Sequence, residues 1–388
     1  MQQNNGLDKN QIISFVLFSL ILFGFMFYFQ GKQAKKDAAN PQQKAKTEQI
    51  AKPVAEVQNL NPTINQDSIK TVSLKNDLLN VQFSSLGGQI SSVELLKFKA
   101  YNQKADKDTD PLYLFNKNNA SYGFLFKDKT GKIFNTKDLV FSPTVSGNTV
   151  TMQYTVNGAI IQFLYTLNQK NEVGCKVKTQ GLAQIVNDGK ADFMWNYNVR
   201  GKEKGRSQEA QHTEFSYGFN NYKSSDYDGR TTMEEPKETL NWIGIKQQFF
   251  GAVIEANGGG FTNSKGNQDQ PKDEKGEFLK TFTFDGQVAM AGNELNQDFT
   301  WYFMPLDLNL LKSYDKNFDE ILPLGWSFIG TLNRHFFIPI YNLLTSWGIA
   351  AGWVIFLITF ITKIILSPLM FQQHKLSAAL RVIRPGLP

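Results

Sequence analysis

Two long apolar runs, one near each end of the chain, predict two membrane-spanning helices. Residues 12–29, IISFVLFSLILFGFMFYF, carry no charge. At the helical rise per residue they reach about 27 Å, close to the thickness of a hydrocarbon core. A cleavable signal peptide is the alternative, but its apolar region is normally shorter and ends at small residues. We therefore interpret residues 12–30 as an uncleaved anchor helix.

The second run, residues 347–371, is long enough to span a bilayer with some tilt, although Lys363 interrupts it. Directly before it, residues 334–346 place apolar side chains at helical spacing and polar ones elsewhere on the helical wheel. This segment is either an amphipathic helix lying in the membrane interface or an extension of the spanning helix. Periodicity alone leaves both alternatives open.

The charges beside the second run predict the orientation of the chain. Residues 372–388 contain Lys375, Arg381 and Arg384 and no acidic residue. The positive-inside rule places such a tail in the cytoplasm. Two crossings then put residues 1–11 in the cytoplasm too, and the long segment between the crossings in the periplasm.

Between the two apolar runs the pattern changes once. Residues 31–66 are rich in Lys, Gln, Ala and Pro and have no aromatic residue, which predicts a flexible tether. Over residues 67–333, short runs of alternating apolar and polar positions predict many β-strands and hence an all-β sandwich, with the numerous phenylalanines in its core. Residues 201–239 are polar and poor in aliphatic side chains, so we expect them to form an excursion from the sheets.

Two hairpins are predicted in detail within this domain. Alternating residues 150–156 and 161–167 flank Asn157-Gly158, a signal for a type I′ turn. The stretch TFTFDGQVAM has the same form, with Asp285-Gly286 between its two halves. We therefore expect the chain to turn at both dipeptides.

Composition offers few residues for chemistry. The single cysteine, Cys175, excludes an intramolecular disulfide and a cysteine-based metal site, and we expect it to be a small residue in a strand. No phosphate-binding loop, HExxH, CxxC or nucleophile elbow occurs. The net charge of +6 is dispersed, which disfavours nucleic-acid binding. The three histidines are His212, His335 and His374.

A sugar-converting sandwich is the enzyme alternative, because such sites use a histidine or paired carboxylates. Only His212 lies in the predicted domain, and a solvated surface histidine is its simpler interpretation. A site built from paired carboxylates stays an open alternative.

Lys363 requires an explanation, because a lysine inside a spanning helix costs about 3 kcal/mol on insertion scales. It faces a polar cavity, or it extends toward the cytoplasmic end of the helix. Ser367 lies four residues later, so a Ser–Lys nucleophile pair is a third alternative, which nothing else in the sequence supports.

Four stretches resemble the YidC family of membrane protein insertases, in the bacterial form with a large periplasmic domain. They are the N-terminal anchor with its charged tether, VSLKNDLLNVQFSSLGGQISSVELLKFKAY, NWIGIKQQFFGAVI, and the long stretch from YDKNFDEILPLGWSF to RVIRP. The resemblance implies a galactose-mutarotase-like super-β-sandwich in the periplasm plus transmembrane helices in the inner membrane.

The resemblance also implies a function. Family members form a hydrophilic groove with a positive charge, which the ITFITK stretch places at Lys363, where many members have arginine. They insert and fold membrane proteins, alone or with the Sec translocon. The implied partners are nascent membrane proteins, Sec components, the ribosome and the lipid bilayer, without nucleic acid, catalytic residues, metal or cofactor.

Residues 372–388 correspond to the start of the family's cytoplasmic hairpin, so we expect a C-terminally truncated member. The alternatives are a membrane-anchored carbohydrate-binding or sugar-converting sandwich and a two-span sensor.

Overall fold

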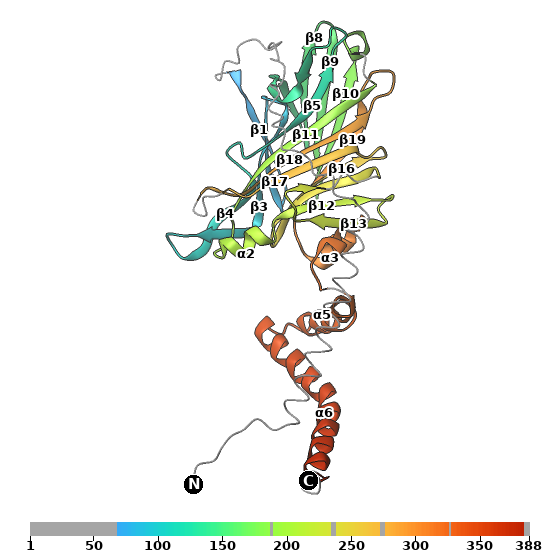
Figure 1. Ribbon diagram of the computed structural model, residues 1–388. Helices are drawn as coiled ribbons and strands as arrows, with labels where there is room; N and C mark the ends of the chain where they lie inside the picture. The colour runs from blue at the N-terminus through green and yellow to red at the C-terminus, as the bar shows by residue number, and fades with distance from the viewer. Residues whose placement is uncertain (1–67, 187–188, 234–237, 272–275, 326, 384–388) are drawn as a thin grey trace. The chain divides into compact units, whose positions relative to one another are not determined.

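The computed structural model describes residues 68–186, 189–233, 238–271, 276–325 and 327–383 (Figure 1). The predicted N-terminal segment 1–11, anchor helix 12–30 and tether 31–66 lie outside these residues. The described chain forms three antiparallel sheets followed by helices.

The largest sheet has nine strands in the order β13-β12-β15-β16-β19-β10-β9-β8-β7. In chain order its strands are β7 (Ser142–Ser146), β8 (Thr149–Val156), β9 (Ala159–Leu167), β10 (Glu172–Gln180), β12 (Glu214–Phe219), β13 (Ser224–Asp228), β15 (Leu240–Lys246), β16 (Phe250–Asn257) and β19 (Asn296–Pro305).

Two smaller sheets accompany it. The six-stranded sheet, ordered β14-β17-β18-β11-β5-β6, consists of β5 (Ala120–Lys127), β6 (Ile133–Asn135), β11 (Lys190–Arg200), β14 (Thr232–Met233), β17 (Thr262–Asp269) and β18 (Phe278–Ala289). The four-stranded sheet consists of β1 (Thr71–Lys75), β2 (Leu79–Ser84), β3 (Gln89–Asn102) and β4 (Lys107–Phe115). Short 3-10 turns, η2 (Thr136–Asp138) and η3 (Leu182–Gln184), and the helix α2 (Arg206–Gln211) connect strands.

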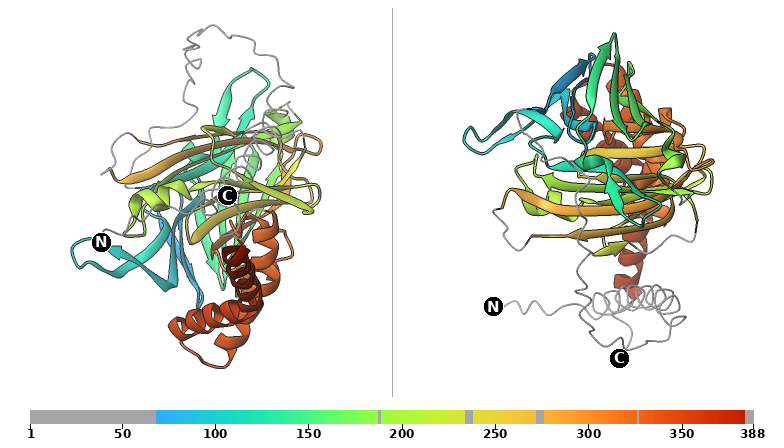
Figure 2. Two further views of the ribbon diagram at one scale, coloured as in Figure 1. Left: turned by 60° about the horizontal axis from the view of Figure 1, so that its bottom comes forward. Right: turned by 90° about the horizontal axis from the view of Figure 1, so that it is seen from above.

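The nine-stranded sheet packs one face against both smaller sheets. From β19, the ring of Trp301 lies 5.1 Å from Trp195 on β11, and the ring of Phe303 lies 5.1 Å from Phe115 on β4. These rings belong to one continuous buried core. Two further views show the strands gathered in stacked layers (Figure 2). The predicted all-β sandwich with an aromatic core is therefore confirmed.

The opposite face of the same sheet carries a second core. Along β19, Tyr302 and Met304 alternate with the inward-facing residues and point outward, where they are nonetheless buried. The cover is the helix α3 (Leu308–Ser313) and the 3-10 turn η4 (Phe318–Ile321). Phe318 meets the ring of Trp242 at 4.9 Å. The segment that leaves the last strand is thus held against the outer face of the sheet.

Of the two predicted hairpins, the first is confirmed and the second is wrong. β8 and β9 pair across Asn157 and Gly158, whose φ angles of 48° and 79° suit a type I′ turn. β18 instead runs straight through Asp285-Gly286. A Cβ on Gly286 would lie 2.9 Å from the ring of Phe284 and 3.1 Å from Cβ of Phe261. This glycine therefore permits close packing within a strand and does not make a turn.

The predicted excursion at residues 201–239 is also wrong for the three strands β12 (Glu214–Phe219), β13 (Ser224–Asp228) and β14 (Thr232–Met233). β12 and β13 form one edge of the nine-stranded sheet, and β14 forms an edge of the six-stranded sheet. Phe215 and Tyr217 supply the buried side chains of β12. An edge strand such as β13 has solvent on one side, so polar side chains are compatible with it. The low aliphatic content of the segment was therefore not a sign that it lies outside the sheets.

The C-terminal helices are α4 (Ser327–Leu332), the π-helical segment η5 (Asn333–Phe337), α5 (Ile338–Ser346) and α6 (Ala351–Ile383). Gly348 adopts a left-handed φ of 76° and its N–H donates to the carbonyl of Thr345, which ends α5. Residues 334–346 are therefore not an extension of the spanning helix.

Among the described residues, one helix is long and apolar enough to cross a membrane, over Ala351–Ala378, and Pro368 lies inside it. The placement of α5 and α6 in a membrane remains a prediction.

Candidate functional site

Lys363 lies on the side of α6 opposite the buried residue Val354. Val354 is fully buried, Leu344 of α5 is nearly so, and the two helices contact each other. Lys363 follows Val354 by nine residues (363 − 354), which at about 100° per residue turns it to the opposite side of the helix. Its side chain is exposed.

The surroundings of Lys363 on α6 are mostly apolar. Thr359 and Ser367 lie one turn before and one turn after it, while Phe360 and Ile364 beside it are exposed apolar side chains. The hydroxyl of Thr359 donates to the carbonyl of Ile355 at 2.8 Å, so its own helix satisfies it. Among the described residues, no hydrogen bond joins Lys363 to Ser367, so the nucleophile pair gains no support. What this face presents is one cation within an apolar surface.

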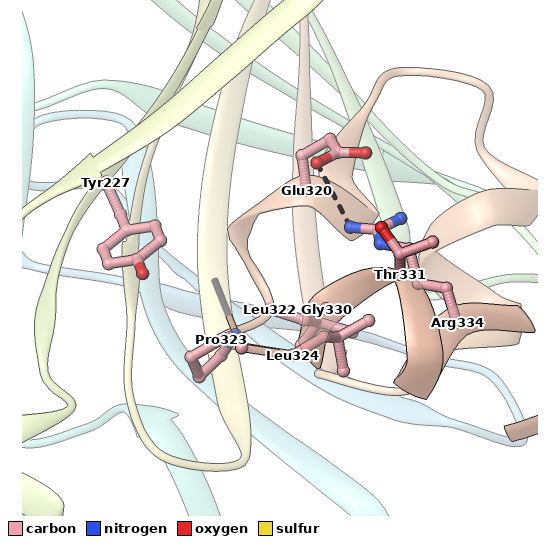
Figure 3. A pocket seen from close by; sticks show the side chains of 9 residues that line it. Tyr227, Glu320, Leu322, Pro323, Leu324, Gly330, Thr331 and Arg334 are labelled. Carbon is pink, nitrogen blue, oxygen red and sulfur yellow. Dashed lines mark ion pairs between the residues drawn. The ribbon is translucent and has the colours of Figure 1, made fainter. Parts of the chain in front are cut away.

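An ion-pair cluster that the sequence did not reveal links the helices to the sandwich. Arg334, in η5, places its Nη1 3.2 Å from Oδ2 of Asp319. Its Nη2 lies 3.1 Å from Oε2 of Glu320, the pair that Figure 3 shows. Both acids belong to η4, which the second core holds through Phe318 and Ile321. We call these three residues the Arg334 clamp. The acids lie fourteen and fifteen positions before Arg334 (334 − 320 and 334 − 319) and belong to a different element, η4, so no local pattern predicts the contact.

A hollow of about 500 Å³ lies beside the Arg334 clamp. Figure 3 shows the exposed ring of Tyr227, from β13, on one side and the segment around Pro323 and Leu324 below the arginine on the other. The ammonium of Lys246 lies 4.6 Å from the centre of the Tyr227 ring. The hollow therefore sits where the edge of the nine-stranded sheet meets the first C-terminal helix.

Glu255 on β16 is a buried carboxylate with three partners. It is 2% exposed. It accepts hydrogen bonds from the hydroxyls of Tyr222 at 2.5 Å and Tyr302 at 2.6 Å, and it pairs with the ammonium of Lys316 at 2.8 Å. Burial, followed by the nearby carboxylate, raises the pKa of both tyrosines above its usual range. Glu255 is thus engaged in fixing residue 316 to the sheet.

Glu209 is a second buried carboxylate with a local structural role. It accepts the backbone N–H groups of Lys202 and Glu203 and the amide of Gln247. Burial raises the pKa of Glu209 above its usual value. His212, the candidate for a sugar site, is half-buried with Nδ1 2.9 Å from the carbonyl of Gln208. Neither group is arranged as a free acid or base.

Next to Glu209, a larger hollow of about 940 Å³ opens to solvent. Its lining includes Arg200 and Glu277, which form an ion pair at 2.7 Å. Lys202, close by in sequence, is buried, and its Nζ donates to the carbonyl of Arg200. Cys175 lies in the strand β10, as predicted. It is also buried, and burial raises its pKa to about 12.

Replacing Lys202 with methionine should stabilise the sandwich. Burial lowers the pKa of Lys202 from its usual 10.5 to about 8, so between those values the unfolded chain binds more protons and the wild type gains stability as pH rises. At pH 7 the free energy of unfolding of the variant should exceed that of the wild type by on the order of 2 kcal/mol, and its rise with pH between about 8 and 10.5 should be lost. Denaturant titrations at several pH values measure both effects. Lys312→Met, at an exposed lysine, is the control and should keep the stability and pH dependence of the wild type. If the free energy of unfolding of Lys202→Met rises with pH as steeply as that of the wild type, the prediction is refuted.

Comparison with known proteins gives a consistent family. The model of the YidC periplasmic domain matches residues 71–338, more than half of the chain. Membrane protein insertase YidC of Parabacteroides distasonis is 27% identical over 428 residues, covering 98% of this chain and 66% of that protein. The corresponding protein of Azobacteroides pseudotrichonymphae is 28% identical, covering 98% and 64%. The chain thus spans slightly less than two thirds of the length of these relatives.

The solved structures that match this chain include YidC from Thermotoga maritima, with a TM-score of 0.31 and 14% identity over 81% of this chain and 78% of that chain. Galactose 1-epimerase from Lactobacillus acidophilus matches with a TM-score of 0.33 and 11% identity over 61% of this chain and 98% of that chain.

Proposed function

The chain belongs to the YidC family of membrane protein insertases, and on that premise we propose that it assists the insertion and folding of inner-membrane proteins. The observation that carries this proposal is Lys363, an exposed cation on an apolar helix, on the side opposite the buried Val354. A buried or lipid-facing charge is costly, and such residues usually mark a path for a polar substrate. The proposed activity needs no cofactor.

In the proposed mechanism, Lys363 faces a hydrophilic groove formed with parts of the protein outside the described residues. Its ammonium attracts polar or acidic parts of an entering chain by charge. Exposed apolar neighbours, such as Phe360 and Ile364, offer a surface for the client's own apolar segment. Lysine acts as a point charge and lacks the planar fork of donors that arginine provides. The attraction is therefore not bidentate.

The topology belongs to the same proposal. Residues 12–30 anchor the chain, 31–66 form a tether, and residues 67–333 form a periplasmic domain. Residues 334–346 lie in the membrane interface and α6 crosses the bilayer, so that both ends of this chain are cytoplasmic. The clients are nascent membrane proteins delivered by the ribosome, with or without the Sec translocon.

Substituting Lys363 tests the proposal in cells that depend on the full-length gene. Lys363→Ala should lower insertion of a small membrane protein by about tenfold or more, equivalent to roughly 1.4 kcal/mol of lost stabilisation. Lys363→Arg should retain most activity because it keeps the charge. Insertion is measured by protease protection of the client in pulse-labelled cells.

The control variant is Lys312→Ala, which removes an exposed lysine of α3, and immunoblots establish equal amounts of each protein. If Lys363→Ala supports insertion as well as wild type at equal abundance, Lys363 is not the groove charge.

A further inference from the structure

One end of the sandwich can be defined by the point at which the chain leaves it. β19 ends at Pro305, which pairs with Phe250 at the start of β16, so the turn at residues 247–249 lies at this end. Glu172 pairs with Tyr302, which brings the turn at residues 168–171 to the same end. We call it the exit end. In Figure 1, β3, β4, α2 and α3 are labelled at this end of the strands.

The last part of β3 joins the exit end through side-chain and backbone contacts. The ring of Phe98 lies 5.2 Å from that of Phe250, edge to face. The N–H of Tyr101 donates to the carbonyl of Lys202, and the amide of Gln247 donates to the carbonyl of Arg200. The ends of β3, β11 and β15 therefore meet here.

The exit end exposes aromatic and basic side chains together. Phe249 is 51% exposed and Phe98 is 37% exposed. Lys97 and Lys99 flank Phe98 and are exposed, and neither forms an ion pair among the described residues. Exposed phenylalanine beside lysine is the composition of segments that sit at a lipid headgroup layer.

The exit end is also the part of the sandwich next to the C-terminal helices. Glu214 of β12 pairs with Lys246 of β15, and Lys246 lies against Tyr227, so Tyr227 is at the exit end. Tyr227 lines the same hollow as Thr331 and Arg334 of α4 and η5 (Figure 3). The helix that leads toward α6 therefore starts beside this end.

We propose that the exit end rests on the surface of the bilayer, with Phe249 and Phe98 in the interface and Lys97 and Lys99 on the phosphates of anionic lipids. The proposal relies on the proposed function only in that α6 spans the membrane. Three acids lie near Lys99: Asp106 pairs with Lys204 at 2.6 Å, Asp110 accepts a hydrogen bond from the amide of Asn102, and Asp108 is exposed. The partner of the exit end is a lipid surface, because its apolar side chains match the interface and its cationic side chains match the anionic headgroups.

The test uses the full chain in vesicles that contain phosphatidylglycerol and a lipid with a nitroxide at headgroup depth. An environment-sensitive dye is attached at Phe249→Cys. The native Cys175 needs no replacement, because it is buried and its thiol has a raised pKa. The control position is Ile133→Cys, since Ile133 is 43% exposed and pairs with Lys127 at the far end of β5.

Nitroxide quenching at position 249 should exceed quenching at position 133 by at least about threefold. The double variant Lys97→Glu, Lys99→Glu should reduce this difference, and so should high salt. Equal quenching at the two positions would overturn the proposal, as would protection of the dye at 249 by protein without quenching by lipid.

Failure of this proposal can be distinguished from failure of the proposed function. Lys363→Ala should leave quenching at position 249 unchanged, because quenching reports the position of the sandwich and not insertion of a client. Conversely, a loss of insertion in Lys363→Ala with equal quenching at positions 249 and 133 would retain the insertase and reject the lipid contact.

Discussion

Replacing Gly218 with alanine should lower the free energy of unfolding of the sandwich by about 3 kcal/mol, the upper part of the range for overpacked cores. A Cβ at this position would overlap Nε1 and Cε2 of Trp242 and come within 2.8 Å of its Cδ1. Trp242 cannot retreat easily, because it is fully buried, packs on Phe318 and donates from Nε1 to the carbonyl of Lys316. The substitution therefore displaces the cover of the second core as well.

The matched control is Gly174→Ala, in β10 of the same sheet. There a Cβ would meet only the carbonyl of Thr166, at 3.8 Å, an ordinary contact. This variant should stay within about 0.5 kcal/mol of wild type. Denaturant unfolding of the full chain in detergent, followed by tryptophan fluorescence, measures both. If Gly218→Ala is as stable as Gly174→Ala, the second core is not packed as described.

Glu255→Ala should cost about 3 kcal/mol, because removing one partner of a buried charge cluster leaves the others without an acceptor. The hydroxyls of Tyr222 and Tyr302 lose their hydrogen-bond acceptor, and Lys316 loses its counter-charge. Glu255→Gln should cost less, since its amide oxygen still accepts a hydrogen bond. The same unfolding assay applies.

Asp298→Ala is the control for charge removal. Its pair with Lys176 lies at 3.0 Å but is well exposed, so its loss should cost less than about 0.5 kcal/mol. A cost for Glu255→Ala no greater than that of Asp298→Ala would show that the cluster does not hold residue 316 to the sheet.

The strands were predictable wherever the local pattern and the tertiary structure agree. The hairpin at Asn157-Gly158 folds as its turn residues require, because both have left-handed φ angles. Asp285-Gly286 is a comparable turn signal, yet the strand continues, because Gly286 fills a position that the ring of Phe284 and Cβ of Phe261 crowd. The distinction depends on Phe261, which is distant in sequence, and no local signal contains it.

The residues of the candidate site likewise fall into those that a local pattern could predict and those that it could not. Lys363 was identifiable because a charge stands out in an apolar run. The Arg334 clamp and the Glu255 cluster were not, because each depends on which segments the fold brings together. Glu255 lies in an apolar strand with no periodic partner, and its tyrosines and lysine are 33, 47 and 61 positions away.

The second core also determines where a mechanical load would enter the domain. Tension on α6 reaches η4 through the connecting chain and the Arg334 clamp, before it reaches the last strand. There, Phe318 and Ile321 pack against the outer face of the nine-stranded sheet. The load is therefore resisted by many side-chain contacts at once, as shear across a face, and β19 is shielded from being peeled off its neighbours one hydrogen bond at a time.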